Sequence, residues 1–182
     1  MRFRLATYSF CLSIGIALGL LTIPAHAEKA DKDKPIALSS DKAQFDDVKQ
    51  IYYLERNVLL IKGSLIIKGE KAEVKIDPEG YQFVTIFAKP GELASLRQKR
   101  DTGFNDFIEG FAELIEYDGK TDIAILQKQA RMNQISGPRV TDQLHGDKIH
   151  YDGNTEKYNV VSKASVKSTL SPRRKELTGP SK

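Results

Sequence analysis

The chain repeats one pattern between Ser40 and Lys167, and this repetition limits its fold more than any other feature. Each of four copies has a small or polar start, alternating apolar residues, an aspartate, a turn and a second alternating run. Alternation with a period of two residues, broken by Asp, Gly and Asn, is typical of antiparallel hairpins. Such a hairpin cannot bury its apolar face alone, so the pattern predicts a stack of similar hairpins. The aspartates that end the first run of each copy are Asp46, Asp77, Asp118 and Asp152.

The spacing of the expected strands predicts an all-β fold with no helix longer than a turn or two. Short strands separated by Gly, Pro, Asn and Asp are typical of a sandwich, a barrel or a jelly roll. Serial repetition of hairpins adds an open roll with a free edge at each end. A longer connection is expected at residues 134–143, and a loop at residues 97–105.

Residues 1–27 have the composition of a secretory signal peptide, with cleavage expected after Ala27. Arg2 and Arg4 supply a positive start, an apolar run follows at residues 12–23, and residues 25–27 form a small-x-small cleavage site. The alternative is an uncleaved membrane anchor. Cleavage is favoured because the run is short for a span of about 20 residues.

The rest of the chain divides into a domain at residues 28–170 and a basic tail at residues 171–182, which we expect to be disordered and solvated. The whole chain has a formal net charge of +4. Arg2 and Arg4 belong to the signal peptide, however, and basic residues gather from Lys163 onward, so the body of the domain is close to neutral. A near-neutral body with a basic end does not have the charge distribution of a nucleic-acid-binding protein.

No motif in the sequence supports catalysis, a metal site or a cofactor. Beyond the signal peptide the histidines are His145 and His150, and their odd separation on one strand would point them to opposite faces. Neither a Gly-x-Ser-x-Gly elbow nor a phosphate-binding loop is present. The repeated aspartates are expected to cap their own turns. An enzyme is therefore the least favoured class.

Apolar side chains on one side of the expected strands form the remaining candidate site. A closed core would account for them, yet every repeat offers the same face and neither end carries an evident cap. Stacked hairpins could therefore enclose an apolar trough along the stack, with Glu73 and Lys75 on the opposite, wet face. The trough is predicted to be lined by Ile36, Leu38, Phe45, Tyr52, Leu54, Leu65, Ile67, Val74, Phe87, Leu93, Ile115 and Tyr117.

Several short motifs together resemble the OstA-like family of lipopolysaccharide-export proteins, the LptA family. Each motif is weak alone, but their order and spacing along nearly all of the domain are specific. The motifs are Pro35-Ile36-x-Leu38-x-Ser40-Asp41, Phe45-Asp46, Asn57-Val58, Gly63-x-Leu65-x-Ile67, Lys71-Ala72, Phe87-Ala88-Lys89-Pro90, Ile115-Glu116-Tyr117 and Gly146-Asp147-Lys148-Ile149-x-Tyr151.

The resemblance implies an open, twisted β-jelly roll in the periplasm, whose apolar interior carries the acyl chains of lipopolysaccharide between the two membranes. It also implies three kinds of partner: the lipid A part of lipopolysaccharide, the jelly-roll domains of LptC-like inner-membrane and LptD-like outer-membrane proteins, and further copies of the chain. No cofactor is implied. The sequence departs from the family pattern where the usual Gly before Asn-Val is Arg56, and where a later Gly-Asn-Ala reads Lys128-Gln129-Ala130.

An open roll has an unpaired strand at each end, and unpaired strand edges pair readily with another chain. The N-terminal edge is predicted to be the strand from Ile36 to Ser40, and the C-terminal edge the strand from Tyr158 to Ser168. These unlike edges would join head to tail and give linear oligomers. The contact residues are predicted to be Ile36, Ala37, Leu38, Ser39, Val160, Val161 and Val166.

Two other interpretations remain open. An inner-membrane relative that resembles LptC would keep its N-terminal segment as an anchor, so the N-terminus of the mature protein distinguishes it. A structural module with a filled core would make protein contacts only, and would not bind a hydrophobic probe that lipopolysaccharide displaces.

Overall fold

The computed structural model describes residues 34–103 and 105–172, and all regular structure in this part is β. The predicted signal peptide and residues 173–182 of the predicted tail lie outside the described residues. Within the described part, no helix is long and apolar enough to cross a membrane. The strands are β1 (Ala37–Ser39), β2 (Lys42–Asp46), β3 (Ile51–Lys62), β4 (Leu65–Ile76), β5 (Gln82–Phe87), β6 (Ala94–Lys99), β7 (Asp106–Ala112), β8 (Leu114–Asp118), β9 (Ile123–Ser136), β10 (Arg139–Asp152), β11 (Lys157–Val161) and β12 (Lys167–Leu170).

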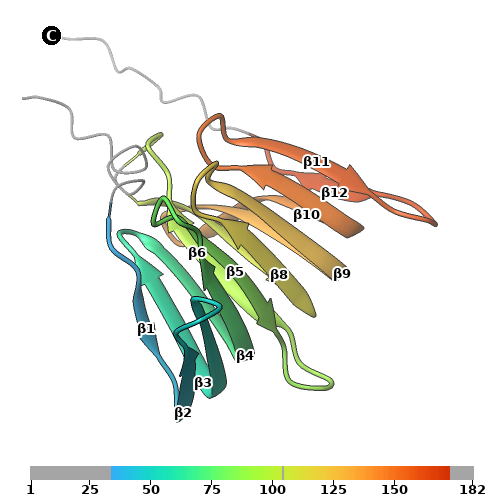
Figure 1. Ribbon diagram of the computed structural model, residues 1–182. Helices are drawn as coiled ribbons and strands as arrows, with labels where there is room; N and C mark the ends of the chain where they lie inside the picture. Colours follow the sequence, from blue (N-terminus) through green and yellow to red (C-terminus); the bar gives the residue numbers. More distant parts are fainter. Residues whose placement is uncertain (1–33, 104, 173–182) are drawn as a thin grey trace, which may run out of the picture.

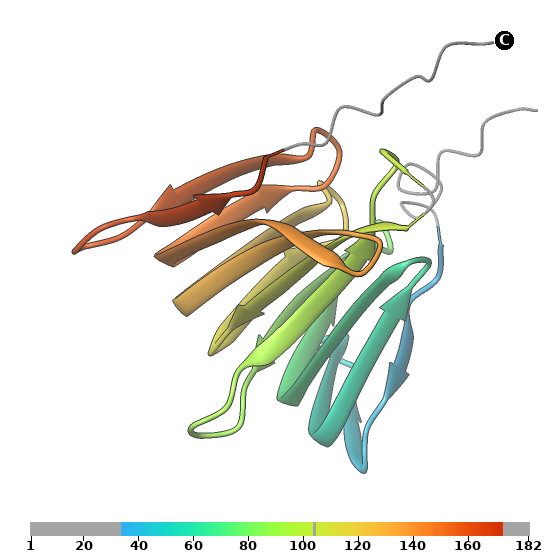
Figure 2. The same cartoon turned by 180° about the vertical axis from the view of Figure 1, so that it is seen from behind.

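These strands form one 12-stranded antiparallel sheet that folds over into two layers. The long strands β3, β4, β9 and β10 bend near their middle and run through both layers, so each pairs with different neighbours in its two halves. Beside halves of the long strands, layer A holds β2, β5, β8 and β11, and layer B holds β1, β6, β7 and β12. Figures 1 and 2 show the array from its two sides, with β1 and β2 at one end and β10 to β12 at the other. The all-β jelly roll predicted from the sequence is confirmed.

The bends in β3 and β9 are made by pairs of residues in the left-handed conformation. The φ angles are 63° at Arg56 and 51° at Asn57, and 64° at Lys128 and 54° at Gln129. The register of β3 on β4 shifts at the same place. These are the two sites where the sequence lacks the glycine of the family pattern. The backbone keeps there the conformation that glycine adopts freely, at a cost for other residues of about 1–2 kcal/mol each.

Glycine is required where β4 and β10 pass the bend. A Cβ atom on Gly69 would lie 2.3 Å from Ile86 Cγ2 and 2.9 Å from the carbonyl oxygen of Phe87. A Cβ atom on Gly146 would lie 2.6 Å from Val160 Cγ1. The neighbouring strand therefore lies closer to each of these glycines than a side chain at that position would permit.

The four repeated aspartates cap their turns, as predicted. Each accepts hydrogen bonds from backbone N–H groups that follow it, which satisfies donors that a turn leaves without a strand partner. All four turns close hairpins of layer A. The donors are Lys49 to Asp46, Glu79 and Tyr81 to Asp77, Lys120 and Thr121 to Asp118, and Asn154 and Thr155 to Asp152, at 2.8–3.2 Å.

Three connections differ from the sequence prediction. The expected long connection at residues 134–143 is a two-residue turn, because β9 runs to Ser136 and β10 begins at Arg139. The expected loop at residues 97–105 begins only at Arg100, after the end of β6. The expected strand from Tyr158 to Ser168 is two strands, β11 and β12, which pair with opposite halves of β10.

Candidate functional site

The space between the two layers is lined by apolar side chains from every part of the sheet. In the centre of the roll, Leu60, Ile86, Leu96, Ile108 and Leu126 are 0–1% exposed. The layers therefore pack directly against each other there, and the middle of the predicted trough is filled by the protein's own side chains. Small buried residues lie near the bends, where the layers converge, and these are Val58, Ala72, Ala94, Ala112 and Ala130.

Most of the predicted trough residues lie in this interior. The buried ones are Leu54, Leu65, Ile67, Val74, Ile115 and Tyr117. Ile36, Leu38 and Tyr52 are partly buried and pack against the core. Phe45 pairs with Tyr52 across β2 and β3 and is 42% exposed.

Phe87 and Leu93 do not belong to the interior, and their prediction is wrong. Phe87 pairs with Lys71 and Leu114 and is 45% exposed, whereas Val84 and Ile86 of the same strand are buried. The alternation of β5 is thus shifted by one residue from the predicted one, which moves every side chain to the other face. Leu93 precedes β6 and is half-buried outside the core cluster.

The sequence prediction missed the contribution of the later strands to the interior. Their signal was present, since β9 and β10 also alternate with a period of two. The buried or packed residues missed there are Ala124, Leu126, Ala130, Met132, Leu144, Ile149 and Tyr151. The predicted wet face is confirmed at Glu73 and Lys75, which are exposed.

The two ends of the interior are less buried than its centre. At the N-terminal end, Ile36, Leu38 and Tyr52 are only partly covered, and at the C-terminal end Tyr158 and Val160 are. Such side chains have apolar surface that a second molecule could cover. The ends are therefore the accessible parts of the apolar interior.

We define the mouth of the roll as the side opposite the bends, where the two layers end. Polar side chains line this mouth. Lys62 is the last residue of β3 and is 2% exposed; its Nζ lies 3.4 Å from the Tyr117 hydroxyl and 3.4 Å from the Gly119 carbonyl oxygen of layer A. Further along, Arg100 of layer B forms an ion pair with Glu156 in the β10–β11 turn. The interior is thus apolar near the bends and polar at the mouth.

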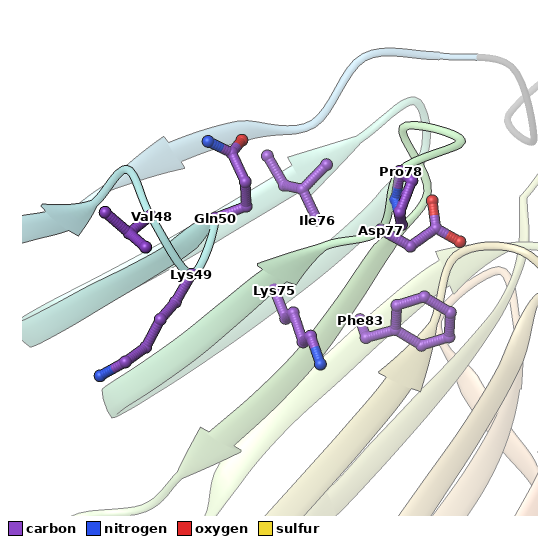
Figure 3. A pocket seen from close by; sticks show the side chains of 8 residues that line it. All are labelled: Val48, Lys49, Gln50, Lys75, Ile76, Asp77, Pro78 and Phe83. Carbon is purple, nitrogen blue, oxygen red and sulfur yellow. The ribbon is translucent and has the colours of Figure 1, made fainter.

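A surface hollow lies outside this interior, at the β2–β3 and β4–β5 turns (Figure 3). Its walls include Lys75 and Phe83, which pair on the outer face of layer A, and Val48 of the first turn. The hollow brings together no nucleophile and base. Among residues 34–103 and 105–172, no group of three or more His, Cys, Asp or Glu is placed to hold a metal ion.

Among the strands that the structure describes, both ends of the roll present unpaired edges. In this part of the chain β1 and β2 each pair with β3 only, and β11 and β12 each pair with β10 only. Of the predicted edge residues, Ala37, Leu38 and Ser39 lie in β1, Val160 and Val161 lie in β11, and Ile36 precedes β1. Val166 lies between β11 and β12 and outside both, and β2 is a further edge that the sequence prediction missed.

The arrangement defines a class: a β-jelly roll with an apolar interior between two layers and free strand edges at both ends. Residues 37–157 match the family model described as "LptA/(LptD N-terminal domain) LPS transport protein", and the chain belongs to this family.

Individual relatives agree with this assignment. The chain is 28% identical over 162 residues to the lipopolysaccharide export system protein LptA of Escherichia coli strain K12, covering 89% of this chain and 83% of that protein. It is 24% identical over 163 residues to the lipopolysaccharide export system protein LptH of Pseudomonas aeruginosa, covering 89% and 87%. The crystal structure of LptH, described as the LptA-homologous periplasmic component of the lipopolysaccharide transport device, superposes with a TM-score of 0.70 at 22% identity, covering 78% of this chain and 99% of that one.

Proposed function

We propose that this protein is a periplasmic carrier of lipopolysaccharide that shields the acyl chains of lipid A between the inner and outer membranes, and that it is not an enzyme. The observation that carries the proposal is the apolar interior between two layers in a chain of the LPS-transport family. Burial of each acyl methylene contributes about 0.8 kcal/mol, so several chains cannot cross water unshielded at a useful rate. The partly covered ends, with Leu38 and Tyr52, are where acyl chains enter.

The same proposal assigns protein partners to the two ends of the roll. β1 and β2 at one end and β11 and β12 at the other have edges that no other described strand pairs, and these edges pair with an LptC-like domain, an LptD-like domain or another copy of the chain. Head-to-tail copies would align their interiors in one line. Sedimentation at rising concentration should show growth of linear oligomers, and Val160→Pro in β11 should reduce it, because proline removes a ladder donor at an edge.

Displacement of a bound hydrophobic fluorescent probe by lipopolysaccharide tests the carrier directly. The filled centre of the roll is the observation behind a second candidate function, a structural module that makes only protein contacts. This module would neither bind the probe nor respond to lipopolysaccharide. An LptC-like anchored protein would bind lipid but keep Met1, whereas the proposed carrier would begin at Glu28, which sequencing of the mature N-terminus decides.

A further inference from the structure

The polarity of the interior changes from the bends to the mouth. Near the bends it is lined by small apolar residues such as Ala94, Ala112 and Ala130. At the mouth, layer B points Lys62 and Arg100 toward layer A. A molecule held between the layers would therefore meet apolar surface on one side and cations on the other.

The Lys62 ammonium group is part of a buried polar cluster that joins the layers. Besides its contacts with Tyr117 and Gly119, the cluster contains Asp122, 7% exposed, whose Oδ1 accepts a hydrogen bond of 2.9 Å from the Tyr117 hydroxyl. A Cβ atom on Gly153 would lie 2.4 Å from Asp122 Oδ2, so glycine at this position leaves room for the carboxylate.

The Arg100 guanidinium joins the layers further toward the C-terminal end. Its Nε lies 3.1 Å from Glu156 Oε2, and its Nη1 lies 3.2 Å from Gln134 Oε1. The side chains of Arg100 and Glu156 are 16% and 21% exposed. Burial opposes the charge of Arg100, but the hydrogen bond and attraction of Glu156 outweigh it, so the pKa of Arg100 is raised.

Packing alone does not account for these charges. A buried ion pair contributes little more to stability than apolar side chains of the same size, and often less. The centre of the roll is filled, so a lipid can enter only if the layers separate, and separation breaks the contacts of Lys62 and Arg100 across the mouth. The Arg100 guanidinium would then line the opened mouth away from the Glu156 carboxylate, and the Lys62 ammonium group would line it away from the Tyr117 hydroxyl.

We propose that Lys62 and Arg100 bind the phosphate groups of the lipid headgroup when the layers separate, and hold the mouth closed through Tyr117, Gly119 and Glu156 when no lipid is bound. This inference rests on the proposed function, because it requires that acyl chains occupy the interior. Guanidinium and ammonium groups bind phosphate through charge-assisted hydrogen bonds, and the planar guanidinium does so with two parallel bonds. Acyl tails then lie toward the bends and the charged headgroup lies at the mouth.

Binding of diphosphoryl lipid A and of dephosphorylated lipid A to the full chain tests the inference. The wild type should bind the phosphorylated lipid about tenfold more tightly, as expected for charged hydrogen bonds. Arg100→Gln and Glu156→Gln break the same ion pair, but only Arg100→Gln removes the cation. Arg100→Gln should abolish most of the preference, whereas Glu156→Gln should keep it and bind lipid faster. Lys120→Gln, which breaks the exposed Lys120–Glu79 pair, is the matched control and should change nothing.

The outcomes separate this inference from the proposed function. If the wild type binds neither lipid, the carrier function fails. If it binds both lipids equally, or if Arg100→Gln and Glu156→Gln change the preference to the same extent, the two cations only join the layers and the inference is wrong. Lys62→Met, which removes the cation, and Tyr117→Phe, which removes its hydroxyl partner, form a second pair with the same expected contrast. Inorganic phosphate at millimolar concentration should not displace the lipid, since the acyl chains supply most of the affinity.

Discussion

The ring of Phe45 stacks on the ring of Tyr52, with centroids 4.2 Å apart and an angle of 26° between the planes. The pair joins β2 to β3 at the N-terminal end of the interior, where Phe45 remains 42% exposed. Two aromatic rings at an open end of an apolar space cover the core and still offer surface to an entering molecule. This pair therefore marks the place where the interior and its surroundings meet.

A photoreactive residue at Leu38 or Tyr52 should crosslink to lipopolysaccharide in cells. Both side chains face the accessible end of the interior. The same residue at Glu73, Lys75 or Phe87, on the outer face of layer A, should crosslink much less. Equal labelling at the two sets would show that lipid does not occupy the interior.

Leu38→Asp should weaken lipid binding more than it destabilises the fold. Leu38 is only partly buried, so the new carboxylate can stay hydrated at the end of the roll, and the free energy of unfolding should fall by about 1–2 kcal/mol. Lipid titration and urea unfolding measure the two effects. Ala37→Asp, on the exposed side of the same strand, is the control. Normal lipid binding by Leu38→Asp would exclude β1 from the path.

Arg56→Gly should raise the free energy of unfolding by up to about 1 kcal/mol. Arg56 has a φ of 63°, which costs an L-residue free energy that glycine does not lose. Its ion pair with Asp41 is exposed and contributes little. Lys42→Gly in β2, where the backbone is ordinary strand, should instead lower stability. A loss of stability in Arg56→Gly would mean that the bend is not strained.

Gly69→Ala should destabilise the protein by about 1–3 kcal/mol, because the added methyl group overlaps Ile86 and the backbone of Phe87. Chemical denaturation measures the change. Lys68→Ala, one residue earlier and exposed, should have an effect within about 0.5 kcal/mol. Similar stabilities of the two variants would contradict the close approach of β4 and β5 at the bend.

Stability should fall in acid as Asp152 becomes protonated. The hydrogen bond from the Thr155 side chain, helped by backbone N–H donors and opposed by burial, lowers the pKa of Asp152 below its ordinary value of 3.8. A lowered pKa in the folded state stabilises the fold above the ordinary pKa, and this contribution disappears as the pH falls through the folded value. Urea midpoints at pH 7 and pH 2.5 should therefore differ less in Asp152→Asn than in the wild type. If the two midpoints differed as much in Asp152→Asn as in the wild type, this role of Asp152 in acid stability would be refuted. Glu73→Gln serves as the control.

The sequence alone determined the features that depend on neighbouring residues. Asp118 caps its turn through Lys120 and Thr121, which lie two and three residues away. Period-two alternation predicted the strands, the absence of long helices and the wet face of β4 at Glu73. Turn chemistry and alternation act over a few residues, so they can be read without knowing which strands pair.

The tertiary structure decided what depends on distant partners. β5 lies between β4 and β8, and this pairing places Val84 and Ile86 inside and Phe87 outside, although the sequence of β5 allows either face. The contact between Lys62 and Tyr117, which lie 55 residues apart in the sequence, follows from the folding of the sheet into two layers. The strand segments on both sides of Arg56 hold its backbone in the left-handed conformation, which arginine does not favour. Burial and contact across the layers exist only after the sheet has folded over, and for that reason the interior and its polar mouth were decided by the whole fold.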